Sequence, residues 1–198
     1  ADGGVRVHLV EREPRLGGNA LRLDRSPEGA DIPEAVRALA ARTLAHPRIT
    51  VHASCEVVRR QGHAGDFTAA VRSRKTPSRE ARLRVGALVV ATGAEEFRGP
   101  VYGLGSNERV LTLLDLGERL RREPDLPRKL GSVIFIGCAG PWDLPSGGAS
   151  WRCSRGCCQT MMRQARVLKE ANPACQLTVL VREVNTYAFR EEDYTAAR

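Results

Sequence analysis

The chain has 198 residues, of which 42% are hydrophobic and 27% are charged, a composition typical of a globular protein with one core or two small domains. No apolar run approaches the roughly 18 residues that a membrane-spanning helix needs. The first residues show no basic segment followed by an apolar one, so a secretory signal is not predicted. We therefore expect a cytoplasmic protein without a membrane span, in which structural disulfides are unusual.

The net charge of +8 raises the question of a nucleic-acid partner. Nearly all of the basic residues are arginines, and the chain contains only three lysines, Lys75, Lys129 and Lys169. The arginines are scattered among acidic residues and form no basic stripe interleaved with aromatic side chains. The pattern is typical of a solvated surface, and no nucleic-acid partner is predicted.

An apolar strand that ends in an acid opens the chain: residues 5–13, "VRVHLVERE", with Glu11 near the end, are followed by a loop containing Gly17 and Gly18. Dinucleotide-binding folds use an acid at the end of their second strand to bind the ribose hydroxyls. The glycine fingerprint of such folds should lie about 20 residues earlier, before residue 1. The chain is then truncated, or another polypeptide supplies the first βα unit, or Glu11 is an ordinary solvated acid.

A helix is predicted over residues 32–47, with Pro33 in its first turn. Residues 49–74 alternate in three short runs and predict a small β-meander. Two further strands are expected within 81–94, and the second, "ALVV" at 87–90, is apolar throughout and should be buried on both faces. Thr92 and Gly93 follow it, and small residues there would let the backbone approach a cofactor, although a tight strand exit needs the same residues.

A polar connection with one helix, residues 110–123, leads to a buried strand at 132–137. After a cysteine-rich segment, a helix is predicted over 157–173 and a strand over 176–183. The order strand, loop, helix, strand defines a βαβ unit. With the corresponding region near the start of the chain, it predicts an α/β protein with parallel sheets.

Four of the six cysteines lie close together in the sequence, with the spacing C-x14-C-x3-C-C, and they are Cys138, Cys153, Cys157 and Cys158. The last two begin a predicted helix, whose N-terminal amides, with Arg152 and Arg155, would favour thiolates. Four thiolates suit an iron–sulfur cluster or zinc, although zinc-ribbon spacing is absent. A redox pair at Cys157 and Cys158 and purely structural cysteines are the alternatives, and adjacent cysteines form a strained bridge. Cys55 and Cys175 are expected to be structural.

The segments "VIFIGCAGPWD" and "WRCSRGCCQTMMRQARVLKE" resemble the A-type subunits of heterodisulfide reductase and their relatives. That family typically shows a strand, a Cys-x-Gly-x-x-Asp loop, the motif Cys-Ser-Arg-x-Cys-Cys and a helix of similar pattern. The segments "VHLVEREPRLGGNA", "VGALVVATGAEEF" and "YGLGSNERVLTLLDLGERL" resemble the FAD region of that family, in the same order. This order also resembles the FAD domain of two-dinucleotide-fold flavoproteins such as thioredoxin reductase.

The resemblance implies an α/β protein with an incomplete two-dinucleotide, Rossmann-like fold. Residues 1–130 would form an FAD-binding-type domain with a β-meander at 49–74, and residues 131–198 a second βαβ unit. The implied FAD-binding residues are Glu11, Gly17, Gly18, Thr92 and Gly93. The implied ligands of a [4Fe–4S] cluster are Cys138, Cys153, Cys157 and Cys158.

The function implied by the resemblance is electron transfer between FAD and the cluster, and on to a partner redox protein. The partners would be ferredoxin-like or heterodisulfide reductase-type proteins in a hetero-oligomeric complex. This sequence departs from the family in lacking the glycine fingerprint. It also has only "KTPSREARL" where many relatives carry a ferredoxin-like cysteine array. Two other functions stay open: a thiol–disulfide oxidoreductase using Cys157 and Cys158, and a non-catalytic assembly protein that has lost FAD.

Overall fold

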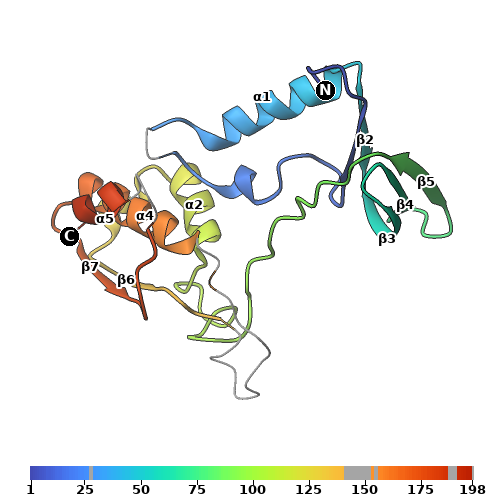
Figure 1. Cartoon of the computed structure of the whole chain (residues 1–198). Coiled ribbons are helices and arrows are strands. Elements are labelled where there is room, and N and C mark those ends of the chain that lie inside the picture. Colours follow the sequence, from blue (N-terminus) through green and yellow to red (C-terminus); the bar gives the residue numbers. More distant parts are fainter. Residues whose placement is uncertain (27–28, 141–152, 154–155, 187–190, 198) are drawn as a thin grey trace. The chain divides into compact units, whose positions relative to one another are not determined.

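The computed structural model describes residues 1–26, 29–140, 153, 156–186 and 191–197. The contacts divide the chain into two compact units, each of which is described by itself (Figure 1). The first unit consists of Ala1–Leu21 and Ile32–Ala94, and the second of Arg22–Asp31 and Glu95–Arg198. These are units of packing, so the functional boundary expected after residue 130 stays a prediction.

The first unit contains a βαβ motif and a separate antiparallel sheet. Its elements are β1 (Val7–Glu11), the 3₁₀ turn η1 (Gly18–Arg22, whose last residue belongs to the second unit), α1 (Ile32–Ala45), β2 (Ile49–Ala53), β3 (Cys55–His63), β4 (Asp66–Ser73) and β5 (Glu80–Val85). β1 and β2 pair in parallel, with Val7 opposite Ile49, and α1 connects them. The predicted helix is therefore confirmed, with Pro33 in its first turn, where a missing N–H group costs nothing.

Two sequence expectations for this unit were wrong in detail. The meander is β3–β4–β5, residues 55–85, because Ile49–Ala53 pairs with β1 instead. The predicted buried strand at 87–90 is not a strand, and Val89 and Val90 are 85% and 78% exposed. An extended run becomes a strand only when a neighbouring strand pairs with its backbone groups. No described strand pairs with this run.

The second unit contains the other βαβ motif. Its elements are α2 (Leu113–Arg122), α3 (Leu126–Lys129), β6 (Ser132–Ile136), α4 (Cys157–Ala171), β7 (Gln176–Leu180) and α5 (Glu191–Ala197). β6 and β7 are parallel, with Ser132 opposite Gln176. Two parallel pairs, each joined through a helix, confirm the α/β class. None of the helices in the described ranges is long and apolar enough to cross a membrane; α4, the longest of them, has 15 residues.

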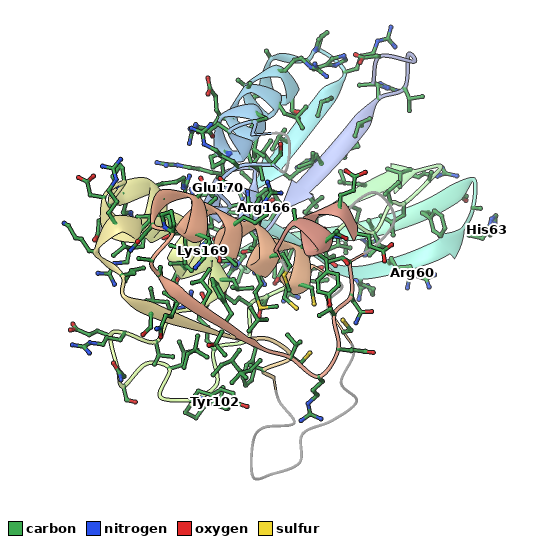
Figure 2. The ribbon with its side chains drawn as sticks, turned by 90° about the vertical axis from the view of Figure 1, so that its left-hand side faces the viewer. Arg60, His63, Tyr102, Arg166, Lys169 and Glu170 are labelled. Atoms are coloured by element: carbon green, nitrogen blue, oxygen red, sulfur yellow. The ribbon has the colours of Figure 1, made fainter. Side chains whose placement is uncertain are left out.

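The core of the second unit lies between α4 and one face of the β6–β7 sheet. Its buried residues are Leu120, Phe135, Met161, Met162, Ala165 and Leu168. The opposite face of the sheet is open, with Ile134 62% and Leu180 52% exposed, so the strand predicted to be buried is covered on one side only. The polar residues Arg166, Lys169 and Glu170 lie along α4, and Arg166 pairs with Glu170 across one turn (Figure 2).

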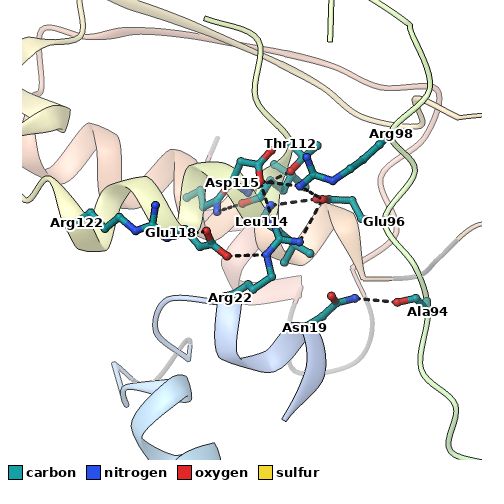
Figure 3. A network of polar contacts seen from close by, with 12 residues as sticks. Asn19, Arg22, Ala94, Glu96, Arg98, Thr112, Leu114, Asp115, Glu118 and Arg122 are labelled. Carbon is teal, nitrogen blue, oxygen red and sulfur yellow. Dashed lines mark hydrogen bonds and ion pairs between the residues drawn. The ribbon is translucent and has the colours of Figure 1, made fainter. Parts of the chain in front are cut away.

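A cluster of charged side chains fixes α2 within this unit (Figure 3). The Arg22 guanidinium donates from Nη2 to Asp115 Oδ1 at 2.7 Å and from Nε to Glu118 Oε1 at 2.6 Å. Arg98 also donates to Asp115 at 2.7 Å and to Glu96 at 2.7 Å. The Arg22 side chain is 27% exposed, so solvent screens these ion pairs only in part.

This cluster predicts a loss of stability in acid. Partial burial acts to raise the pKa of Asp115, but the hydrogen bond from Arg98 and the charges of Arg98 and Arg22 outweigh it and hold that pKa below its ordinary value. A lowered pKa in the folded state stabilises the protein above the unfolded-state pKa of about 4, and this stability is lost as the pH falls through the folded-state value. Urea unfolding between about pH 7 and pH 3 should therefore show a falling free energy of unfolding.

The Asp115→Asn variant should be less stable at neutral pH and should show a shallower acid slope than the wild type. Asp125→Asn is the matched control, because Asp125 and its partner Arg128 are 72% and 74% exposed and contribute little. If the free energy of unfolding fell equally with pH in the wild type and in Asp115→Asn, the acid sensitivity would not come from Asp115.

Candidate functional site

The cysteine site lies at the carboxyl edge of the β6–β7 sheet, where α4 also begins. In parallel sheets with helical crossovers, this edge is where ligands bind. β6 is followed by Gly137, whose N–H donates to Leu180 O at 2.8 Å. A Cβ atom at residue 137 would lie 2.7 Å from Val181 Cγ1, so a larger residue there would displace the Val181 side chain.

Cys138 follows this glycine in a left-handed backbone conformation, with φ at +57°. This region is uncommon for residues other than glycine and costs about 1–2 kcal/mol. The conformation places the Cys138 thiol 3.9 Å from the carbonyl oxygen of Glu183, in the segment that follows β7. Backbone strain of this kind is concentrated at functional sites.

Cys157 and Cys158 are the first two residues of α4, after the N-cap residue Gly156. Cys158 is 3% exposed, and its thiol lies 4.0 Å from Glu183 O. Burial raises the pKa of Cys158, and the neighbouring Cys157 and Cys138 raise it further, while the N–H of Asn185 opposes them. That N–H donates to Cys158 Sγ at 3.5 Å.

Cys153 joins the same group through the side chain of Asn185, whose Nδ2 donates to Cys153 Sγ at 3.8 Å. The segment Glu183–Asn185 thus contacts three of the four clustered cysteines, and all four are unbridged. Among the described residues, no three His, Cys, Asp or Glu side chains are grouped closely enough to hold a metal ion as they stand. The predicted roles of Arg152 and Arg155 lie outside the described residues.

The predicted flavin residues all lie in the first unit. Glu11 ends β1, and its Oε1 accepts the N–H of Glu13 at 2.8 Å, which orients the carboxylate. Gly17 and Gly18 both have positive φ, +122° and +47°. A Cβ at Gly17 would lie 2.7 Å from Leu21 Cγ, whereas a Cβ at Gly18 would have nothing within 4 Å. Gly17 is therefore needed for packing, and Gly18 borders open space.

The glycine loop and the segment holding Thr92 and Gly93 are brought together by one hydrogen bond. Asn19 Nδ2, directly after Gly18, donates to Ala94 O at 2.8 Å, directly after Gly93 (Figure 3). Thus two of the predicted flavin segments, separated by about 75 residues, lie side by side. No hydrogen bond described for Glu11 links it to either of them.

Two asparagines in these sites were not predicted from the sequence, Asn19 and Asn185. A signal for each was present. Asn19 follows the Gly-Gly pair directly, and Asn185 lies just beyond the carboxyl end of the strand paired with the cysteine-bearing strand. Ligands bind at this edge of a parallel sheet, so the segment after each strand, including the one with Asn185, is a candidate for the site.

The fold and the site define an α/β protein with a cluster of cysteine thiols at the carboxyl edge of a parallel sheet. The chain resembles the A-type subunits of heterodisulfide reductase at the family level. The A-type subunit of the ferredoxin:CoB-CoM heterodisulfide reductase of Methanosarcina acetivorans is 29% identical, over 59% of this chain and 19% of that protein. An A-type iron–sulfur subunit of the CoB-CoM heterodisulfide reductase of Methanopyrus kandleri is 29% identical, over 58% of this chain and 19% of its own length.

The chain thus spans about a fifth of the length of these curated relatives, which are named as subunits of redox enzymes. No family model matches the chain. Among solved structures, L-proline dehydrogenase from P. horikoshii aligns with 96% of this chain and 33% of its own, with a TM-score of 0.48 and 11% sequence identity.

Proposed function

We propose that the chain is an electron-transfer component of an oxidoreductase, in which electrons pass between FAD and a [4Fe–4S] cluster and then to a partner redox protein. The observation that carries the proposal is the contact of one short segment, Glu183–Asn185, with three of the four clustered cysteines. When bound, the cluster would supply one-electron chemistry and the flavin would couple it to two-electron chemistry.

The cysteines fit a cluster by their chemistry. Four thiolates are the usual ligand set of a [4Fe–4S] cluster. Cys157 and Cys158 lie in the first turn of α4, where backbone N–H groups and the helix dipole favour negative sulfur atoms. The raised pKa of Cys158 means that its proton is released when metal binds, as is general for thiolate ligands.

The flavin residues fit their proposed roles through the Asn19–Ala94 hydrogen bond, which supports a common binding surface for the glycine loop and Thr92–Gly93. Gly18 would let the backbone approach the cofactor phosphates or ring, since nothing described lies where its side chain would be. Glu11, at the end of β1, would accept hydrogen bonds from ribose hydroxyls.

Alanine substitutions at the two adjacent glycines separate packing from cofactor contact. Gly17→Ala should lower the free energy of unfolding by about 1–2 kcal/mol, because its methyl group overlaps Leu21 and Val36. Gly18→Ala should cost about 1 kcal/mol of stability but weaken FAD binding at least about tenfold, because its methyl group would occupy the space proposed for FAD. Fluorescence titration with FAD and thermal unfolding measure the two effects. A Gly18→Ala variant that binds FAD with wild-type affinity would contradict the proposal that FAD lies beside Gly18.

The proposed partners are redox proteins rather than nucleic acids. Ferredoxin and the CoB-CoM heterodisulfide occur in the names of the relatives, and we propose that the electron partner is a ferredoxin-like or heterodisulfide reductase-type protein. Many arginines of the described chain are engaged in ion pairs, as between Arg84 and Asp66 at 2.8 Å, which agrees with a surface not built for phosphate backbones.

A stepwise reductive titration tests the proposal. Protein reconstituted anaerobically with iron, sulfide and FAD should lose the yellow flavin absorbance and the broad cluster absorbance at about 400 nm in separable steps. Bound flavin and cluster that never exchange electrons would refute electron transfer between them. A metal-free protein that gains two hydrogens by mass on reduction would favour a dithiol at Cys157 and Cys158. Failure to bind FAD would favour a non-catalytic assembly protein.

A further inference from the structure

Asn185 lies between two of the proposed cluster ligands and donates a hydrogen bond to each. Its backbone N–H reaches Cys158 Sγ at 3.5 Å, and its side-chain Nδ2 reaches Cys153 Sγ at 3.8 Å. Asn185 is half-buried and comes from the segment after β7, outside the cysteine motif itself. Two donors from one residue thus converge on two sulfur atoms.

The packing of the residues that precede Asn185 holds it in place. Val181 and Val184 pack against the core formed by α4 and the sheet. Gly137 allows the close approach of Val181, as the 2.7 Å distance from a Cβ at that position shows. The donors of Asn185 are therefore positioned by the fold before any metal binds, which is the arrangement that tunes a metal site effectively.

The effect on a cluster follows from charge. Adding one electron makes the cluster and its thiolate sulfurs more negative, and N–H donors stabilise the more negative state more strongly. The carbonyl of Glu183 acts differently, because it lies 3.9 Å from Cys138 Sγ and 4.0 Å from Cys158 Sγ. It can accept hydrogen bonds from thiols, but thiolates have no proton to donate to it.

We propose that Asn185 is a positioning residue that raises the reduction potential of the cluster by donating hydrogen bonds to Cys153 and Cys158. This inference rests on the proposed cluster-binding function. The step concerned is a one-electron reduction, with the electron supplied by reduced flavin or by the partner protein. Asn185 forms and breaks no covalent bond and loses no proton in it.

Two variants of nearly the same size as asparagine test the inference. Asn185→Leu removes the side-chain donor, and Asn185→Asp also adds a negative charge beside Cys153. The equilibrium constant for cluster reduction should fall about tenfold in Asn185→Asp, a shift of about 59 mV for a one-electron couple, and by a smaller factor in Asn185→Leu. Redox titrations of the reconstituted full chain, monitored by electron paramagnetic resonance, measure the reduction potential of the cluster in each variant. Iron analysis of the same samples gives the metal content. If Asn185 had only a structural role, the reduction potentials of the two variants would not fall in the order of the added negative charge.

Asn172→Asp is the matched control, because Asn172 lies at the other end of α4 and its Nδ2 donates to Leu130 O at 3.0 Å. Its cluster should keep the wild-type potential. An iron-loaded Asn185→Asp variant with the wild-type reduction potential would overturn this inference but not the proposed function. Loss of iron from both Asn185 variants with unchanged circular dichroism would also overturn it, by assigning Asn185 to cluster retention. A wild-type chain that binds no iron would overturn both the inference and the proposed function.

Discussion

Replacing Cys138 by glycine should make the metal-free protein slightly more stable and nearly abolish its iron binding. Cys138 has a φ of +57°, which costs a residue with a side chain about 1–2 kcal/mol and glycine almost nothing. Glycine loses more conformational entropy on folding, so the net gain should be up to about 1 kcal/mol. The iron content after anaerobic reconstitution should fall from about four per chain to below one, because a [4Fe–4S] cluster needs four ligands.

Cys175→Ala should show the opposite pattern. Cys175 is fully buried just before β7 and is not one of the proposed ligands, so its truncation should cost about 1 kcal/mol and leave the iron content unchanged. Urea unfolding of the metal-free proteins and iron analysis of the reconstituted ones give the two numbers for each variant. Full iron loading of Cys138→Gly would remove Cys138 from the ligand set.

Replacing Arg22 by alanine should destabilise the second unit by about 2–3 kcal/mol. Arg22 neutralises Asp115 and Glu118 at 2.7 and 2.6 Å, and Glu96 lies 3.5 Å from it. The three carboxylates are between 17% and 27% exposed, so each would lose one of its counter-charges in a partly buried position. The measurement is the free energy of urea unfolding, monitored by circular dichroism.

Arg128→Ala provides the comparison for that loss. Arg128 pairs with Asp125 at 3.3 Å on the surface, and both side chains are more than 70% exposed. Its removal should change the stability by less than about 0.5 kcal/mol. Equal effects of the two substitutions would show that the cluster around Arg22 does not stabilise this unit.

The local patterns of the sequence were sufficient for most helices and strands, because apolar spacing and proline positions act within one element. The helix at Ile32–Ala45 and the βαβ unit around α4 follow from such patterns. The apolar run at 87–90 was predicted to be a strand because its pattern shows which surface it could bury. Strand formation depends on a pairing neighbour, and the composition of the run carries no information on that neighbour.

The same distinction applies to the candidate sites. The spacing of the four cysteines indicated a common site, since residue type and position carry that signal. The hydrogen bonds of Asn185 to Cys153 and Cys158 depend on the parallel pairing of β6 with β7, which is a tertiary feature. Likewise, the bond between Asn19 and Ala94 joins segments far apart in the sequence. Sequence patterns thus sufficed to propose the ligand-type residues, and the fold was needed to find Asn19 and Asn185 beside the proposed sites.

The iron content of the chain after anaerobic reconstitution, measured against protein concentration, tests the central claim most directly. The proposed site predicts about four irons per chain, held by Cys138, Cys153, Cys157 and Cys158. A chain that holds one zinc ion and no iron after the same treatment, or no metal at all, would contradict it.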